Sequence, residues 1–269
     1  MSTLQSRGIK KHLYTVSSHY SFVARIKQYF IILRILMTEY RTTWPFRVFH
    51  GFILPFVFIS FVRIARGIPG SEQANFLLGG CMAAAIAYGP ISTLINKIGR
   101  GKQLNEFHYW TSLPVPKLAL ILAILTTALL FALPGFIGVY LIGSLILNYP
   151  LRGGLILFFL IPLGAFSLAG LGAFLGAYAP NAQAATIIGN FMTIFIGFLS
   201  PLYIPLDHLP VLLRNVAPFI PVTYVADAFR IGLAGHVNIN LAIDVVILVL
   251  FSIGFLGLVH FRLDWRATK

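Results

Sequence analysis

Charged residues are scarce in this chain, and acidic residues are scarcer still. Only 10% of its 269 residues are charged and only seven are acidic, whereas 58% are hydrophobic. Soluble domains are about 45–50% apolar and about 25% charged. A soluble fold of this size could not keep so much apolar surface away from water. The composition therefore excludes a soluble enzyme and a disordered chain, and it indicates a membrane protein with several spans.

The sequence also lacks paired cysteines and enzyme motifs. Its single Cys81 excludes an intrachain disulfide. It contains no G-x-x-x-x-G-K-[ST], H-E-x-x-H or G-x-S-x-G motif and no cluster of Cys and His. We therefore expect the chain to have no catalytic residues, no metal site and no cofactor of its own. Asp244 stands at the start of the last apolar run, where it can reach water, so no acid is expected at mid-membrane depth.

Long apolar runs are what the sequence has in abundance. A membrane-spanning helix needs about 20 mostly apolar residues. Six runs meet this requirement, at about 48–65, 74–96, 118–147, 153–178, 183–204 and 241–261. We predict an all-α polytopic membrane protein in which residues 48–269 form a domain of six transmembrane helices.

Basic residues are distributed unevenly about these runs. The segments on the side of the termini, 1–47, 97–117, 179–182 and 262–269, carry fifteen of the 20 Lys and Arg residues, and the other side carries five. Lys and Arg accumulate in cytoplasmic loops, so we expect a multi-pass protein of the plasma (inner) membrane with both termini in the cytoplasm. This topology explains the net charge of +13 without nucleic-acid binding.

Residues 1–47 are predicted to form a cytoplasmic tail and an amphipathic helix in the membrane interface. Apolar residues recur there at helical steps of three and four, while cations such as Arg25 occupy most of the remaining positions. Ile31 and Ile32 interrupt the polar face. The apolar positions are Phe22, Ile26, Tyr29, Phe30, Leu33, Leu36, Met37 and Tyr40. The helix could serve as a membrane anchor or contact a cytosolic partner.

The loop at 97–117 is the longest connection predicted on the cytoplasmic side. It opens with a glycine-flanked basic turn and closes with Pro114 and Pro116. The segment 104–110 is long enough for one or two helical turns and contains Phe107, Tyr109 and Trp110. These rings could lie in the headgroup region, or they could enter a groove on a soluble protein together with Glu106.

Proline recurs at 201, 205, 210, 218 and 221, from the end of the fifth run into the segment before the sixth. Short helices are predicted at 209–216 and 221–233, the second ended by Gly235. Because neither helix is long enough to cross a membrane, residues 205–235 predict a re-entrant hairpin opposite the termini. Asp227 and Arg230 are expected to pair. The apolar side chains expected to be buried are Leu209, Leu212, Leu213, Tyr224 and Phe229.

Two segments resemble those of a known family, the permease subunits of type-2 ABC exporters, which include drug, nodulation-factor and polysaccharide exporters. The first segment runs from Ser200-Pro201 through Leu209-Pro210 to Pro221-Val222-Thr223-Tyr224 and Ala228-Phe229-Arg230. The second runs from Gly101 to Pro114. The sequence departs from many members at Ile220-Pro221, where they have Asn-Pro.

The resemblance implies a role for each segment. Two copies of the chain would pair with two separate ATP-binding subunits, which would hold ATP and Mg. The loop, and with it the amphipathic helix at Arg25, Ile26, Tyr29, Phe30, Leu33 and Leu36, would contact the ATPase. The coupling residues would be Gly101, Leu104, Asn105, Glu106, Phe107, His108, Tyr109, Trp110 and Pro114. The outer gate would comprise Pro201, Pro205, Leu209, Pro210, Leu213, Pro221, Tyr224, Asp227 and Arg230.

The predicted function is thus the membrane permease of an ATP-driven exporter, carrying a lipid-like, drug-like or glycan substrate. The alternative is a channel or secondary carrier that works without ATP. The residues themselves indicate a polytopic protein without its own energy source, and the absence of charge clusters in the spans mildly favours a hydrophobic or amphiphilic cargo.

Overall fold

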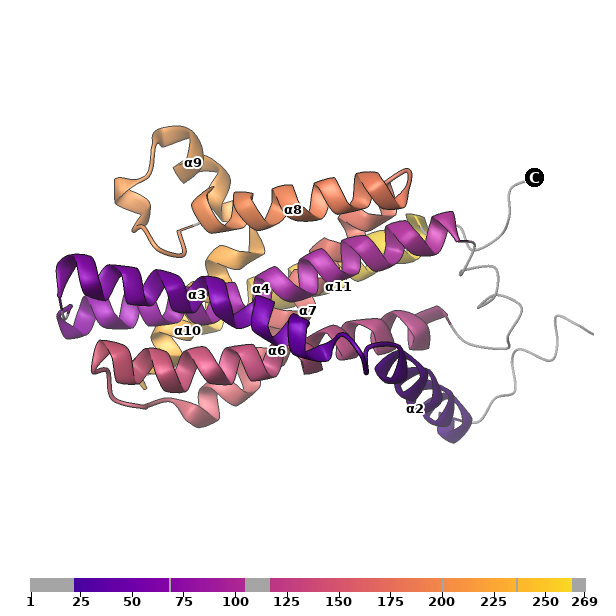
Figure 1. Cartoon of the computed structure of the whole chain (residues 1–269), viewed down its shortest axis with the longest axis horizontal. Coiled ribbons are helices and arrows are strands. Elements are labelled where there is room, and N and C mark those ends of the chain that lie inside the picture. The colour runs from indigo at the N-terminus through magenta and orange to yellow at the C-terminus, as the bar shows by residue number, and fades with distance from the viewer. Residues whose placement is uncertain (1–21, 68, 105–116, 200, 236, 263–269) are drawn as a thin grey trace, which may run out of the picture.

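A computed structural model describes residues 22–262 except 68, 105–116, 200 and 236 (Figure 1). Every regular element in this part of the chain is helical. The long helices are α2 (Phe22–Glu39), α3 (Trp44–Arg66), α4 (Ser71–Gln103), α6 (Lys117–Leu147), α7 (Gly154–Tyr178), α8 (Ala182–Leu199) and α11 (Ile239–Arg262). The short ones are η2 (Leu206–His208), α9 (Val211–Val216), η3 (Ala217–Phe219) and α10 (Pro221–Ala234).

Within the described residues, five helices are long and apolar enough to cross a membrane: α3, α4, α6, α7 and α11. They coincide with five of the six predicted spans, which confirms the all-α polytopic class. The predicted span at 183–204 is shorter than expected, because α8 ends at Leu199. Its 18 residues reach about 27 Å, slightly less than the about 30 Å of a hydrocarbon core.

Helix α4 forms the centre of the bundle. It packs against α3, α6, α7, α8 and α10, and 83% of its most apolar stretch is buried. Small residues make this possible, because Gly79, Gly80 and the run from Ala83 to Ala85 let neighbouring backbones approach closely. The other helices therefore take their positions from α4.

The C-terminal end of α4 corrects one prediction. Residues 97–103 were expected to begin a glycine-flanked turn, but they continue the helix to Gln103. Gly99 does not form a turn but allows α4 to pack closely against α8, because a Cβ on Gly99 would lie 2.3 Å from the Cβ of Ala185. Lys102 helps to hold this end in place by donating hydrogen bonds to the carbonyls of Ala177 and Ala179.

Helix α2 lies where the amphipathic helix was predicted, but its packing face differs from the prediction. It packs on α6, and the Tyr29 hydroxyl donates to Thr126 Oγ1 at 2.8 Å. Ile32, which was assigned to the polar face, is buried, whereas Ile26 and Phe30 are exposed. The helix is rotated because α6 offers an apolar surface, and the outward residues are left to contact lipid.

Internal prolines are a shared feature of the long helices. Pro55 lies inside α3, Pro90 inside α4, Pro134 inside α6 and Pro162 inside α7. Each proline lacks the N–H that would bond to the carbonyl four residues earlier. Such prolines are tolerated in membrane helices where neighbouring helices compensate for the lost bond.

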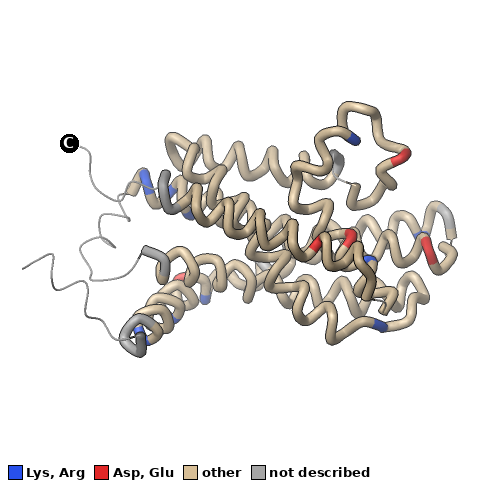
Figure 2. The backbone as a smooth tube through the Cα atoms, turned by 180° about the vertical axis from the view of Figure 1, so that it is seen from behind, with Lys and Arg blue, Asp and Glu red and all other residues tan. Residues whose placement is uncertain are grey.

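Charge is concentrated toward the ends of the bundle (Figure 2). The start of α2 and the end of α11 lie at one end of the molecule, and the loop carrying α9 lies toward the other (Figure 1). Most Lys and Arg residues that the figure colours lie near α2 and the end of α4, and long stretches of helix between the ends carry no charge. This is the distribution expected of helices that cross an apolar layer.

Candidate functional site

The predicted hairpin, residues 205–235, is present as a chain of short helices. Pro205 precedes η2, Pro210 precedes α9, and Pro221 is the first residue of α10. Gly235 ends α10 in the left-handed conformation, with φ of 76°. The segment α9–η3 meets α10 at a bend of 83°, so prolines and a terminal glycine define the element as predicted.

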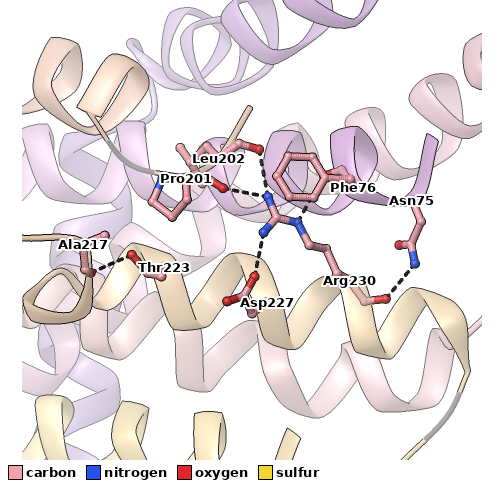
Figure 3. A network of polar contacts seen from close by, with 8 residues as sticks. All are labelled: Asn75, Phe76, Pro201, Leu202, Ala217, Thr223, Asp227 and Arg230. Atoms are coloured by element: carbon pink, nitrogen blue, oxygen red, sulfur yellow. Dashed lines mark hydrogen bonds and ion pairs between the residues drawn. The ribbon is translucent and has the colours of Figure 1, made fainter. Parts of the chain in front are cut away.

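Arg230 on α10 is the centre of the polar contacts in this region (Figure 3). Its Nη1 donates to Asp227 Oδ1 at 2.6 Å, which confirms the predicted ion pair. Its Nη2 donates to the carbonyl oxygens of Pro201 at 2.8 Å and Leu202 at 3.0 Å. Its Nε donates to the carbonyl oxygen of Phe76 at 3.2 Å. One guanidinium therefore joins α10, α4 and the turn at Pro201 and Leu202 that follows α8.

Two further contacts strengthen this junction. The guanidinium carbon of Arg230 lies 3.6 Å from the centre of the Phe76 ring, a cation–π arrangement. The Asn75 amide donates to the carbonyl oxygen of Arg230 at 3.2 Å. The Arg230 side chain is only 12% exposed, and burial of a charge is tolerated when its hydrogen bonds are satisfied in this way.

Glycines allow the three segments to come this close. A Cβ on Gly79 would lie 2.6 Å from Cγ of Arg230, and one on Gly80 would lie 1.8 Å from the carbonyl oxygen of Leu202. Gly153, with φ of 73°, lies against α10. A Cβ on Gly153 would lie 1.8 Å from the carbonyl oxygen of Gly232. Any side chain at these positions would separate the hairpin from the bundle.

The first turn of α10 is fastened to the residues before it. The Thr223 hydroxyl donates to the carbonyl oxygen of Ala217 at 2.8 Å, and the Tyr224 hydroxyl donates to that of Pro218 at 2.9 Å. Leu209 and Phe229 are buried, as predicted, and Leu213 and Tyr224 are partly buried. The hairpin thus has a well-packed half, α10, and a looser half that includes α9.

The prediction for Leu212 was wrong. Its side chain is 73% exposed, because α9 has only six residues and its main contact is with η3. Arg214 and Asp207 lie close to each other, at 3.9 Å, but both are well exposed. Exposed pairs of this kind contribute about 0–1 kcal/mol, so the Asp227–Arg230 pair is the one that fixes the hairpin.

A thiol-labelling experiment tests this arrangement. We expect cysteines replacing Asp207 and Leu212 to react readily with N-ethylmaleimide in the detergent-purified protein, because both side chains are exposed. A cysteine replacing Leu209, which is 8% exposed, should be protected. The native Cys81 is fully buried and provides an internal unreactive reference. Protection at 212 equal to that at 209 would contradict the exposed position of α9.

The predicted coupling residues are described only in part. Gly101 is buried in the last turn of α4, and Leu104, just after it, is 61% exposed. Asn105, Glu106, Phe107, His108, Tyr109, Trp110 and Pro114 lie outside the described residues. The predicted roles of these seven residues therefore remain predictions.

Asp244 corrects a second prediction. It was expected to reach water at the start of the last span, but its side chain lies at 9% exposure on α11. Within the described part of the chain it accepts no hydrogen bond, and it interacts electrostatically with Asp227 and Tyr224. The prediction failed because the packing of α10 against α11 is not visible in the sequence of either helix.

Sequence reasoning also missed the partners of Arg230 on α4. Asn75 and Phe76 were not predicted to contact the hairpin, which follows more than a hundred residues later in the chain. The signal available was the Gly79-Gly80 pair, which the sequence identified as a place of close helix approach without indicating the partner.

A bundle of long apolar helices with a proline-bounded, bent hairpin docked on its central helix defines an all-α, multi-pass membrane protein. Comparison with known proteins supplies the family. The ABC-2 type transporter family matches residues 23–234, and the chain belongs to this family. The match includes the amphipathic helix, the loop at 97–117 and the hairpin, and it ends with α10.

Two curated proteins are also similar. The probable multidrug ABC transporter permease YbhS of Escherichia coli strain K12 is 30% identical over 132 residues, which cover 48% of this chain and 34% of that protein. The protein of the same name from Escherichia coli O157:H7 matches with the same values. The chain thus aligns with about a third of the length of these relatives. Together with the family, they identify a transporter permease.

Proposed function

We propose that this protein is the permease of an ATP-driven exporter, in which two copies pair with two separate ATP-binding subunits. Family membership supports a partner that binds ATP. The name of the Escherichia coli relative and the apolar character of the bundle support a drug-like or other amphiphilic cargo. In this proposal the hairpin is the exit gate and the loop at 97–117 receives the movement of the ATPase.

The observation that carries the proposal is the path of α4. The helix begins beside Arg230, where Phe76 accepts a hydrogen bond from the hairpin, and it continues as one element to Gln103, directly before the loop. A helix of this length extends about 50 Å. Movement of the loop by a soluble partner would therefore reach the hairpin through a single helix.

The proposal also assigns the orientation. Both ends of the described chain lie on one side of the bundle (Figure 1), and the excess of Lys and Arg on that side supports a cytoplasmic location. Cysteines at 207 and 214 should then react with a membrane-impermeant thiol reagent from outside intact cells. Reaction only after the cells are opened would show that the hairpin lies on the cytoplasmic side. This result would contradict the proposed orientation and the role of the hairpin as an exit gate.

Trp110→Ala tests the proposed coupling loop. If Trp110 enters a groove on the ATP-binding subunit, the variant should lose transport and at least tenfold in affinity for that subunit, because interface aromatics carry about 2 kcal/mol or more. Folding and insertion should be unchanged. Affinity is measured by titrating the ATP-binding subunit onto the purified permease.

Trp44→Ala is the matched control for this experiment. Trp44 begins α3 and is 51% exposed, so its loss also removes a large exposed ring near a membrane surface. The control should keep normal affinity and transport. Normal transport in the Trp110→Ala variant would contradict docking on the ATP-binding subunit. It would indicate that the aromatic residues of the loop anchor it in the headgroup region.

One observation favours a different energy source. The buried carboxyl of Asp244 is a group that a proton-coupled carrier could use, since buried acids in membrane spans often serve in proton relays. Transport by vesicles containing the permease and the ATP-binding subunit separates the two functions. Uptake into inverted vesicles that requires ATP and persists in Asp244→Asn supports the exporter. Uptake that follows an imposed pH gradient, and disappears in that variant, supports the carrier.

A further inference from the structure

A polar cavity of about 250 Å³ lies between the end of α2 and the second half of α4. Its lining includes Ser92, Thr93, Asn96, Lys97 and Arg100 of α4 and Glu39 of α2. The cavity is at the end of the bundle opposite α9, and it is separate from the hairpin.

Fixed polar groups organise one wall of the cavity. The Asn96 amide donates to the carbonyl oxygen of Ser92 at 2.9 Å, and the amide oxygen of Asn96 accepts from the Thr186 hydroxyl at 2.8 Å. Lys97 donates to both carboxylate oxygens of Glu39, at 2.8 and 2.7 Å. Arg100 is exposed at the rim. The lining thus carries two cations and one carboxylate, so its charge is positive.

An apolar crevice continues from this cavity. It shares Tyr40 and Thr93 with the cavity, and its other walls are mostly small or apolar residues, including Gly51, Ala85 and Ala128. The crevice is narrow, with a volume of about 20 Å³, which corresponds to about one water molecule. It is therefore too small to hold a hydrocarbon chain, and the chains of a lipid bound at the cavity would stay in the bilayer.

The surroundings indicate a lipid-facing site. Trp44 is 51% exposed and Phe46 is 77% exposed just beyond Tyr40, and Trp is typical of the membrane interface. Basic pockets at the ends of membrane helices suit acidic headgroups. A polar, cationic cavity beside exposed interface residues matches the anionic headgroup of a lipid whose chains remain in the bilayer.

We propose that this cavity binds the phosphate group of an anionic amphiphile, with a membrane phospholipid as the occupant. Arg100 and Lys97 supply the charge, and the Ser92 hydroxyl can donate to a phosphate oxygen. The hydrocarbon chains remain in the surrounding bilayer. Glu39 competes with the phosphate for Lys97. This binding does not depend on the direction or energy source of transport.

The test measures binding of fluorescent phosphatidylglycerol to the purified full-length protein in detergent. Phosphatidylcholine with the same chains and glycerol 3-phosphate serve as competitors. We expect phosphatidylglycerol to bind at least fivefold more tightly than phosphatidylcholine, and glycerol 3-phosphate to compete poorly because it lacks the chains. Arg100→Gln should weaken phosphatidylglycerol binding about fivefold, the effect of about one cation near a membrane surface, and Arg100→Lys should restore most of it.

Two variants distinguish a specific site from general surface charge. Glu39→Gln should tighten phosphatidylglycerol binding, because it removes the carboxylate that competes with the phosphate for Lys97. If the Lys97–Glu39 ion pair were purely structural, this variant would not tighten lipid binding. Arg41→Gln removes an exposed cation that is close in sequence to Glu39 but not part of the lining, and it should change binding less than twofold.

Three results would overturn the proposal. Equal affinity for the two phospholipids would show that the cavity does not select an anion. Equal competition by glycerol 3-phosphate would identify a site for soluble phosphates. Unchanged lipid binding in Arg100→Gln, with loss of binding to the ATP-binding subunit, would identify the cavity as a protein contact. Each result leaves the proposed exporter function intact, because that function is tested by ATP-dependent transport.

Discussion

Arg230→Ala is expected to destabilise the protein by about 3–5 kcal/mol, because it removes three hydrogen bonds from a charged group to backbone carbonyls, each of which contributes about 1.5–3 kcal/mol when considered alone. The substitution leaves the carbonyl oxygens of Phe76, Pro201 and Leu202 without the donor that joins them, and it leaves Asp227 without its cation. We expect a clear fall in the midpoint temperature of thermal unfolding. The midpoint is measured by size-exclusion chromatography of samples heated to increasing temperatures. Transport should also be lost, because the hairpin would no longer be fixed to α4.

Two variants control this experiment. Arg214→Ala removes an arginine from the same hairpin, but its partner Asp207 lies 3.9 Å away and both are exposed, so stability should change by no more than about 0.5 kcal/mol. Arg230→Lys keeps the charge but replaces the planar fork, and it should lie between the wild type and Arg230→Ala. A stability of Arg230→Ala similar to that of Arg214→Ala would contradict the assigned contacts.

Gly80→Ala is expected to have an effect of similar size through a single methyl group. Its Cβ would lie 1.8 Å from the carbonyl oxygen of Leu202, so the connection at 201–202 must move and withdraw two acceptors from Arg230. Overpacking costs about 1–3 kcal/mol, and a lost hydrogen bond to a charged group costs about 1.5–3 kcal/mol. We expect a total of about 3–5 kcal/mol and a reactive cysteine at position 209, which is protected when Gly80 is present.

Gly254→Ala, inside α11, is the control for this experiment. A Cβ at Gly254 meets nothing within 4 Å, and alanine is about 1 kcal/mol more favourable than glycine inside a helix. This variant should therefore be as stable as the wild type or slightly more so. If both substitutions were equally harmless, the close approach of α4 to Leu202 would be wrong.

The sequence predicted the local features of the hairpin because local chemistry determines them. Prolines cannot donate backbone hydrogen bonds, so Pro210 and Pro221 mark helix starts wherever the chain is packed. Gly235 ends α10 because glycine adopts positive φ without strain. The pairing of Asp227 with Arg230 follows from their separation of three residues on one helix.

The contacts between distant segments were not predictable in the same way. In a chain with 58% hydrophobic residues, almost every helix is apolar on all sides, so a helical period does not identify the buried face. Ile32 was therefore assigned outward although it packs on α6, and Leu212 was assigned inward although α9 leaves it exposed. Three of the hydrogen bonds from the Arg230 guanidinium go to backbone carbonyls, those of Phe76, Pro201 and Leu202, which every residue carries and no side-chain pattern reveals.

The internal prolines have a mechanical consequence, because three of them lie in helices that meet at neighbouring levels. Pro55 in α3 leaves the Gly51 carbonyl without its usual helical donor, and a Cβ on Gly135, next to Pro134 in α6, would lie 3.6 Å from that oxygen. A Cβ on Gly51 would lie 3.6 Å from the carbonyl oxygen of Ala85 in α4. The next residue, Ile86, also has a carbonyl without its usual helical donor, because Pro90 lacks an N–H. Helices bend most easily where this bonding is interrupted. The bundle therefore has a soft layer at this level, and movement that enters α4 at the loop would reach the segment beside Arg230 as a tilt about Pro90.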